Sequence, residues 1–322
     1  MTANIGTDIA RAADILAKGG LVAIPTETVY GLAANALNET AVLKVFEAKN
    51  RPSFDPLITH LAEKAELKKY ARGVPPQAAQ LIETFWPGPL TLVLPKEDKI
   101  SSLISSGLET AAFRMPRHPL LHELLTSLDF PLVAPSANPF GYVSPTNAGH
   151  VFNQLGNKID YILDGGPTKI GLESTILGFR NDIPTVLRLG GLSVEAIEEV
   201  IGPVMVSRSS SSKPDAPGML ISHYSPSKQV VLGNIEQLIL AYPGRKKGVL
   251  SFSKKYPDFS NFVLSENGDL SEAATRLFTG LRCFESQDID LIITELVPDT
   301  GLGRAINDRL NRASYLKDNA DN

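Results

Sequence analysis

The chain is predicted to be an α/β protein, with a twisted mixed sheet in a large first domain and a small doubly wound second domain. In the first 200 residues, short apolar segments of strand character follow one another too closely for strict alternation with helices, which favours a mixed sheet. A segment rich in serine, proline and glycine interrupts this pattern after residue 200. Beyond it, strands and helices alternate regularly. We therefore predict a domain over 1–205, a linker over 206–228 and a second domain over 229–322.

The elements of the first domain follow from apolar periodicity and from capping residues. Ile9, Ala12 and Leu16 share one helical face, and a glycine pair at 19–20 ends that helix. Asn38 is predicted to cap a second helix, which Pro52 limits. Further helices are predicted near 76–85, 118–127, 146–154 and 193–201. Strands are predicted at 21–25, 57–60, 90–95, 111–115, 131–135, 161–164, 174–179 and 185–188.

The second domain has a simpler predicted order. Strands are expected at 230–232, 249–252 and 291–294, and helices near 234–241, 271–284 and 303–312. This alternation is typical of a parallel sheet with helices on both faces.

Composition narrows the class of protein. No segment approaches the roughly 20 apolar residues that a membrane span needs, and the first 20 residues lack the apolar core of a secretory signal. Cys283 is the only cysteine, so we expect no internal disulfide and a reducing, cytoplasmic location. The formal charge of −4 argues against wholesale coating of nucleic acid, although a local basic pocket is compatible with it.

The segment 25–60 is the most informative part of the sequence. It contains a Thr-Glu-Thr turn around Thr28, a helix, the cations Lys49 and Arg51, and a strand that ends at His60. Two cations at a helix C-terminus could simply complement the helix dipole, or they could converge on a polyphosphate. His60, taken alone, is more typical of a satisfied core histidine than of a catalyst. The common phosphate-loop, dinucleotide and metal motifs are absent from the sequence.

Polar residues also mark several other strands. Arg114 interrupts an apolar strand and therefore needs a carboxylate partner, from either the protein or a ligand. Ser136 and Asn138 end another strand, Ser174 begins the next, and Arg188 lies inside a fourth. Because open α/β sheets bind ligands at strand ends, these residues together indicate a binding site.

Eight sequence pieces, in this order and spacing, resemble the YrdC-like threonylcarbamoyl-AMP synthases. They are PTETVYGL (25–32), KNRP (49–52), PLITH (56–60), WPGPLT (86–91), AFRMP (112–116), PSAN (135–138), STI (174–176) and VLRLG (186–190). The pieces PGMLISHYSP (217–226) and AINDRLNRAS (305–314) resemble the longer, two-domain form of the family. The resemblance implies a YrdC-like catalytic domain, a linker that crosses the active site, and a small Rossmann-like C-terminal domain.

The resemblance also implies a nucleotidyltransferase reaction in which L-threonine, bicarbonate and ATP give threonylcarbamoyl-AMP, pyrophosphate and water. A downstream transferase system would then move the threonylcarbamoyl group to an adenosine next to the anticodon of tRNA. Contact with tRNA itself is expected to be indirect. Mg²⁺ is expected to arrive with ATP, and no protein ligand for a metal is assigned.

The site residues implied by the resemblance fall into two groups. The threonine site would be formed by Thr28, His60, Arg114, Ala134 and Ser174. The ATP site would be formed by Lys49, Arg51, Asp55, Thr110, Ser136, Asn138, Ser144, Arg188 and Tyr224, the last reaching in from the linker. Lys49, Arg51, Ser136 and Asn138 are expected to be catalytic. Asp55 departs from the asparagine of many relatives, and a carboxylate near phosphates would repel them unless it binds magnesium or points away.

Three rival functions are also considered. A double-stranded RNA or tRNA-binding module without adenylation activity would show steep salt dependence and no need for threonine. A carbamoyl-transfer enzyme of hydrogenase maturation would carry zinc-type cysteine pairs, which a single cysteine argues against. A role in regulation or ribosome assembly is a third alternative.

Overall fold

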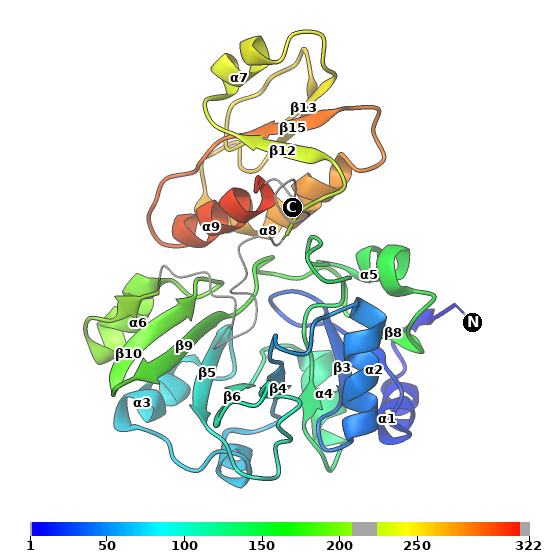
Figure 1. The fold of residues 1–322 in the computed structure, drawn as a ribbon, viewed down its shortest axis with the longest axis vertical. Helices are drawn as coiled ribbons and strands as arrows, with labels where there is room; N and C mark the ends of the chain where they lie inside the picture. The colour runs from blue at the N-terminus through cyan, green and yellow to red at the C-terminus, as the bar shows by residue number, and fades with distance from the viewer. Residues whose placement is uncertain (1, 208–223, 316–322) are drawn as a thin grey trace, which may run out of the picture. The chain divides into compact units, whose positions relative to one another are not determined.

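The computed structural model describes residues 2–207 and 224–315. These residues form two compact units, shown in Figure 1. The larger unit is built mainly from residues before 208. The smaller unit is built from residues after 223 together with Gly141–Val143 and Ile170–Leu172.

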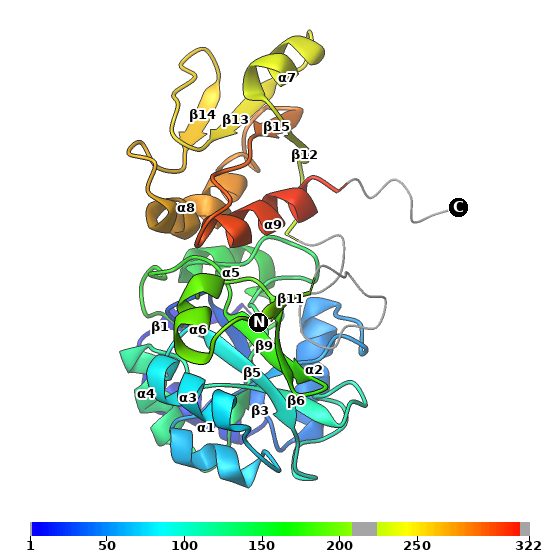
Figure 2. The same cartoon turned by 90° about the vertical axis from the view of Figure 1, so that its left-hand side faces the viewer.

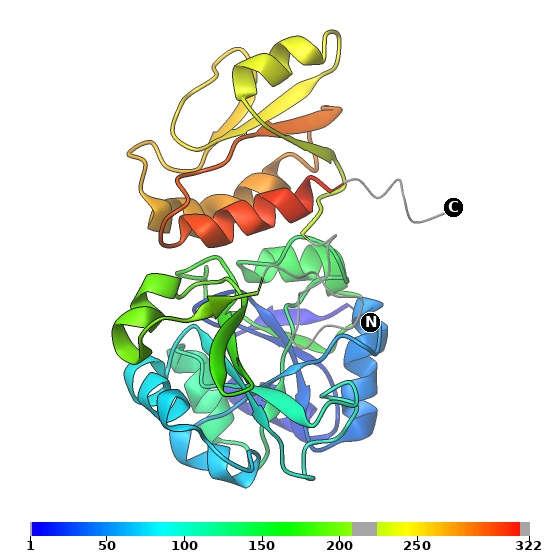
Figure 3. The same ribbon diagram turned by 60° about the vertical axis from the view of Figure 1, so that its left-hand side comes forward.

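The larger unit is organised around one mixed sheet of eleven described strands. The spatial order is β1-β8-β2-β3-β7-β4-β6-β5-β9-β10-β11, and Figure 3 shows that the sheet is twisted. Most of the central neighbours are antiparallel, whereas β4 runs parallel to β6 and β5 runs parallel to β9. The strands are β1 (Asn4–Gly6), β2 (Val22–Ile24), β3 (Gly31–Asn35), β4 (Ile58–His60), β5 (Leu90–Pro95), β6 (Thr110–Arg114), β7 (Leu132–Val133), β8 (Tyr161–Leu163), β9 (Thr175–Arg180), β10 (Ile183–Arg188) and β11 (Met205–Val206).

Helices pack around this sheet. They are α1 (Ile9–Ala17), α2 (Glu39–Lys49), α3 (Pro76–Phe85), α4 (Pro119–Thr126), α5 (Ala148–Leu155) and α6 (Val194–Ile201), with a 3₁₀ helix at Lys64–Lys69. Helices α1, α2, α5 and α6 each begin at a residue whose side chain caps the helix. Asn38 caps α2 by accepting a hydrogen bond from the Ala41 N–H, as predicted. The end of α2 differs from the prediction, because Asn50 adopts a left-handed conformation (φ 51°) and stops the helix before Pro52.

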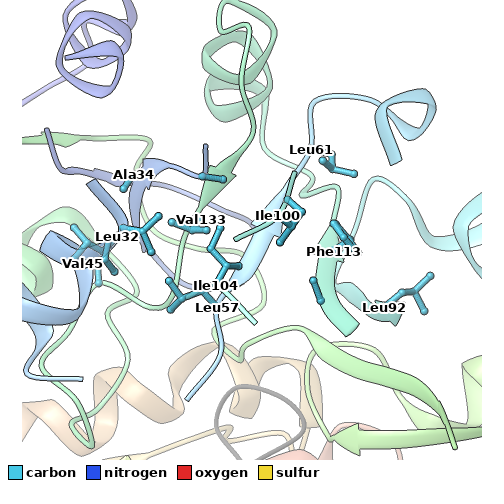
Figure 4. Packing of buried hydrophobic residues seen from close by; sticks show 14 of the residues in the cluster. Leu32, Ala34, Val45, Leu57, Leu61, Leu92, Ile100, Ile104, Phe113 and Val133 are labelled. Atoms are coloured by element: carbon cyan, nitrogen blue, oxygen red, sulfur yellow. The ribbon is translucent and has the colours of Figure 1, made fainter. Parts of the chain in front are cut away.

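The main core of the larger unit lies between the sheet and its helices. Figure 4 shows Leu32 beside Val45, which joins β3 to α2, and Leu57 beside Ile104. Phe113 of β6 is also completely buried in this core. This packing fixes the strands whose ends carry the predicted site residues.

The smaller unit contains a four-stranded parallel sheet in the order β12-β15-β13-β14. Helix α7 covers one face and α8 and α9 cover the other, as Figures 1 and 2 show. The bounds are β12 (Gln229–Leu232), α7 (Ile235–Ala241), β13 (Lys247–Ser251), β14 (Ser260–Val263), α8 (Leu270–Cys283), β15 (Leu291–Thr294) and α9 (Gly303–Ala313).

The predicted fold class is confirmed, since a large mixed sheet is accompanied by a small parallel α/β sheet. Strands β1, β3, β11 and β14 were not predicted from the sequence. Most of the predicted linker, including the piece resembling the family around 217–223, falls on 208–223 and lies outside the described residues. The boundaries at 205 and 229 therefore stay predictions. No helix within residues 2–207 or 224–315 has the length and apolar character needed to cross a bilayer.

Candidate active site

The predicted threonine residues lie on neighbouring central strands. His60 on β4 and Arg114 on β6 are partners in the parallel register, so their side chains leave the same face of the sheet. Ala134, which follows β7, donates its N–H to the Ile58 carbonyl at 3.1 Å, two residues before His60. A Cβ on Gly31 would lie 3.0 Å from the Ala134 methyl group, so glycine allows β3 to approach closely here.

Arg114 has a carboxylate partner from the protein. Its Nη2 lies 2.8 Å from Glu27 Oε1, and the two side chains are only 4% and 6% exposed. Arg114 Nε also donates to the Gly88 carbonyl at 3.1 Å. The sequence required a partner for this buried charge, and the structure identifies Glu27 as the protein's contribution.

His60 is held neutral beside this ion pair. Burial and the nearby Arg114 charge lower its pKa to about 3. Its Nδ1 lies 3.2 Å from the Ile58 carbonyl, and in the neutral ring this nitrogen donates to the oxygen, leaving Nε2 as an acceptor. His60 therefore presents an uncharged acceptor at neutral pH.

Thr28 lies in a turn that its own neighbours rigidify. Its backbone N–H donates to Thr26 Oγ1 at 3.0 Å, and the two threonine hydroxyls lie 2.7 Å apart. Both side chains are buried. The same turn carries Glu27 between them, so the Thr-Glu-Thr sequence holds the backbone of the carboxylate that contacts Arg114.

The predicted phosphate residues Lys49, Ser136 and Asn138 are in contact. Lys49 Nζ donates to the Ser136 carbonyl at 2.6 Å and to the Asn138 carbonyl at 2.5 Å. The Lys49 side chain is almost fully buried, and burial together with the Arg51 charge lowers its pKa well below the usual lysine range. The end of α2 is thus joined to the loop that follows β7.

Arg51 and Asp55 form a buried ion pair. Arg51 Nη2 lies 2.9 Å from Asp55 Oδ2, and the side chains are 5% and 0% exposed. Arg51 also donates to the Asp55 and Pro56 carbonyls at 3.1 and 2.8 Å. The Asp55 carboxylate, which would repel phosphates, is therefore directed at the Arg51 guanidinium.

A third group links β5, β9 and β10. Arg188 donates from Nε and Nη2 to the Ser174 carbonyl at 3.2 and 2.9 Å, and from Nη2 to Ser174 Oγ at 3.2 Å. The Thr91 hydroxyl lies 2.8 Å from Ser174 Oγ. Ser144 Oγ donates to Glu173 Oε1 at 2.5 Å. Two predicted residues, Ser144 and Arg188, thus bond to the short segment 173–174, which contains the third, Ser174.

The last two predicted residues, Thr110 and Tyr224, have other surroundings. Thr110 begins β6, where it pairs in register with Pro95. Tyr224 belongs to the smaller unit, where it has φ 65°, stacks on Phe278 at 5.6 Å, and lies under the Arg309 guanidinium at 4.9 Å. The assignment of these two residues to the ATP site stays a prediction, as do the ligand assignments of the other site residues.

Glu27, Thr91 and Glu173 were not predicted from the sequence as members of these clusters. Glu27 was visible as the centre of the Thr-Glu-Thr turn, and the need of Arg114 for a carboxylate was the signal that could have paired them. Thr91 and Glu173 carried no comparable signal, because each looks like ordinary strand or turn chemistry in the sequence.

Comparisons with known proteins match both units. A family model described as Telomere recombination, of the Sua5, YciO and YrdC proteins, matches residues 14–190. A second model, described as the C-terminal domain of threonylcarbamoyl-AMP synthase, matches residues 192–314. Together these matches extend over most of the chain.

Individual relatives match over nearly their whole length. The threonylcarbamoyl-AMP synthase of Bacillus subtilis is 45% identical over 320 residues, covering 95% of this chain and 92% of the relative. The synthase of Pyrococcus abyssi is 43% identical over 318 residues, covering 94% and 93%. The crystal structure of P. abyssi Sua5 complexed with L-threonine has a TM-score of 0.92, 40% identity and 98% coverage of both chains. The chain therefore belongs to the Sua5/YrdC family, in its two-domain form.

Proposed function

We propose that this chain is an L-threonylcarbamoyladenylate synthase, a nucleotidyltransferase that makes threonylcarbamoyl-AMP and pyrophosphate from L-threonine, bicarbonate and ATP. The observation that carries the proposal is the continuity of one short segment. Glu27 contacts Arg114, and four residues later Gly31 bridges to Ser136, whose carbonyl receives Lys49. This continuity supports the assignment of a carboxylate-binding centre and a phosphate-binding centre to one site.

In the threonine half, Arg114 binds the substrate carboxylate through its guanidinium. A charge-assisted hydrogen bond of this kind contributes about 1.5–3 kcal/mol. His60 and Thr28 supply an uncharged nitrogen and a hydroxyl for the substrate's own hydroxyl. Ala134 and Ser174 complete the assigned set, the former at the narrow approach of β3 to the β7 loop.

In the ATP half, Lys49 and Arg51 neutralise the phosphates, and Ser136 and Asn138 orient them. Thr110, Ser144, Arg188 and Tyr224 are assigned to the same nucleotide, and Asp55 acts on it through Arg51. Removing one preorganised donor of this type typically costs about 3 kcal/mol, or roughly a hundredfold in rate.

The reaction proceeds in two steps. The threonine amine and bicarbonate condense to a carbamate with release of water. A carbamate oxygen then attacks the α-phosphorus of ATP, the bond to the β-phosphate oxygen breaks, and pyrophosphate leaves. The protein's contribution is to hold two anionic reactants together and to neutralise the phosphate charge.

Magnesium belongs to the nucleotide in this proposal, held mainly by phosphate oxygens and water. Within the described ranges no three His, Cys, Asp or Glu side chains converge as a metal site. Asp55, the acidic residue beside the cations, is engaged by Arg51. We propose that ATP carries the ion into the site.

The product is a reactive mixed anhydride, so a transferase system that modifies tRNA must consume it. We place this activity in the cytoplasm, where ATP and tRNA meet. We also propose that the segment between the domains closes over the site and excludes water. Ending the chain at residue 205 should then lower net synthesis, and full activity of the shortened protein would contradict this closure.

Pyrophosphate release from ATP tests the function directly. The full chain is assayed with Mg²⁺, threonine and bicarbonate, and then with threonine or bicarbonate omitted. We expect release only in the complete mixture. Release that ignores either omission would reject the proposal, whereas salt-sensitive RNA binding without any release would support the RNA-binding alternative, for which none of the relatives described above is named.

A further inference from the structure

The Arg114–Glu27 pair is less satisfied than a purely structural ion pair should be. Glu27 Oε1, Glu27 Oε2 and Arg114 Nη2 are buried, yet none of these atoms has a hydrogen bond of good geometry within the described parts of the chain. The two charges are 2.8 Å apart, and within residues 2–207 and 224–315 only Arg114 Nε has a further fixed partner, the Gly88 carbonyl. Buried groups of this kind are costly and call for an explanation.

An α-amino acid at neutral pH has the complementary arrangement of charge. Its carboxylate and its ammonium group are attached to one carbon, so two opposite charges lie side by side. A buried carboxylate next to a buried guanidinium also places a negative and a positive charge side by side, so each can face the opposite charge of the amino acid. A zwitterion laid against this pair would bring carboxylate to guanidinium and ammonium to carboxylate, and each contact would be charge-assisted.

We propose that Glu27 binds the ammonium group of the amino acid substrate while Arg114 binds its carboxylate, so that the ion pair is a receptor for the zwitterion. This inference rests on the proposed function and adds Glu27 to its substrate-binding residues. The unpartnered Oε2 atom is the acceptor that the ammonium group requires.

The surroundings of the pair support this assignment. His60 is neutral, so it does not compete with Arg114 for the substrate carboxylate. Among the described residues His118 also lies near Glu27; burial lowers the pKa of His118, while a hydrogen bond with the Gly165 backbone and the Glu27 charge raise it. Thr26 and Thr28 bond to each other, so they hold the backbone of Glu27 and leave its carboxylate to the ligand.

The test compares two ligands that differ only at the amine. Binding of L-threonine and of (2S,3R)-2,3-dihydroxybutanoate is measured by calorimetry on the full-length protein and on Glu27→Gln. In the unaltered protein we expect threonine to bind at least about tenfold more tightly, as one charge-assisted bond implies. In Glu27→Gln this preference should largely disappear, because threonine weakens by about 10–100-fold and the hydroxy acid by much less.

A matched control is Glu272→Gln, which alters a glutamate of the smaller unit that is also paired with an arginine, Arg276, at 2.9 Å. This variant should keep the preference for threonine over the hydroxy acid. If Glu27→Gln weakens both ligands equally, Glu27 acts only by holding Arg114, and the proposal is overturned. If Glu27→Gln does not fold, Glu27→Asp should weaken threonine more than the hydroxy acid and so reduce the preference, whereas equal weakening of both ligands would again overturn the proposal.

Two measurements on the unaltered protein distinguish a failure of this inference from a failure of the function on which it rests. Equal affinity for threonine and the hydroxy acid, together with threonine-dependent pyrophosphate release, would overturn the role of Glu27 and leave the synthase intact. Absence of threonine-dependent release would instead remove the function itself.

Discussion

Replacing Asp55 with asparagine tests whether this carboxylate is a built-in counterion for Arg51. The pair has an oxygen-to-nitrogen distance of 2.9 Å and side chains that are 0% and 5% exposed. Neutralising one partner of a buried pair typically costs about 3–5 kcal/mol. Arg51 keeps its bonds to the Asp55 and Pro56 carbonyls, so we expect about 3 kcal/mol. For a unit of this size that corresponds to a fall in Tm of about 6–12 °C.

The assay is thermal unfolding of the full chain with and without Mg-ATP. Phosphates would supply the anion that Asp55→Asn removes and would meet less repulsion, so ATP should stabilise the variant more than the unaltered protein. Asp14→Asn is the matched control, because Asp14 and Lys18 form the same i, i+4 pair at 59% and 74% exposure. Its effect should stay below about 0.5 kcal/mol.

Two results would refute this reasoning. Unchanged stability of Asp55→Asn would mean that the buried pair contributes nothing. Weaker ATP binding would mean that the carboxylate contacts the nucleotide or its magnesium directly.

Three further predictions concern the same site. Lys49→Met should lower pyrophosphate release at least about a hundredfold while leaving threonine binding by calorimetry within about twofold, and near-normal release would contradict a role for Lys49 on the phosphates. Arg114→Lys should raise the KM for threonine by about tenfold or more and leave the KM for ATP unchanged, since lysine lacks the guanidinium fork; a parallel rise in both would argue against it. Because the folded pKa of His60 is lowered to about 3, the unfolded chain binds this proton first as pH falls. Chemical denaturation should therefore show stability lost between about pH 6.5 and 3, and His60→Asn should reduce the slope over pH 4.5–6 by up to about 1.4 kcal/mol per pH unit, whereas an unchanged slope would show that His60 takes no part.

Much of the fold could be predicted because apolar periodicity reports which residues face a core. The strand ending at His60 and the helix capped by Asn38 were recognisable in this way. Strand β3 (Gly31–Asn35) was missed because its small residues, Gly-Leu-Ala-Ala-Asn, lack the branched and aromatic side chains that mark a strand. It exists because β2 and β7 pair with it on either side.

The site was predictable in its cations and hydroxyls but not in its carboxylates. The charge of Arg114 inside an apolar strand indicated that a carboxylate must pair with it. The sequence contains 35 acidic residues, however, and no sequence rule selects Glu27 among them. Asp55 was conspicuous for the opposite reason, since it seemed wrong beside phosphates. Pairing across a sheet or around a turn depends on three-dimensional register, which local periodicity does not specify.

The position of β8 between β1 and β2 has a consequence for synthesis on the ribosome. Asn4 and Val22 both pair in register with Tyr161, and the Asp8 N–H donates to the Tyr161 hydroxyl across 153 positions of sequence. When the first half of the chain has emerged, this edge of the sheet has no strand to close it. The N-terminal segment can therefore pair with the sheet only after residues 161–163 have been synthesised. Until then its strand edges are exposed to chaperones or to other nascent chains.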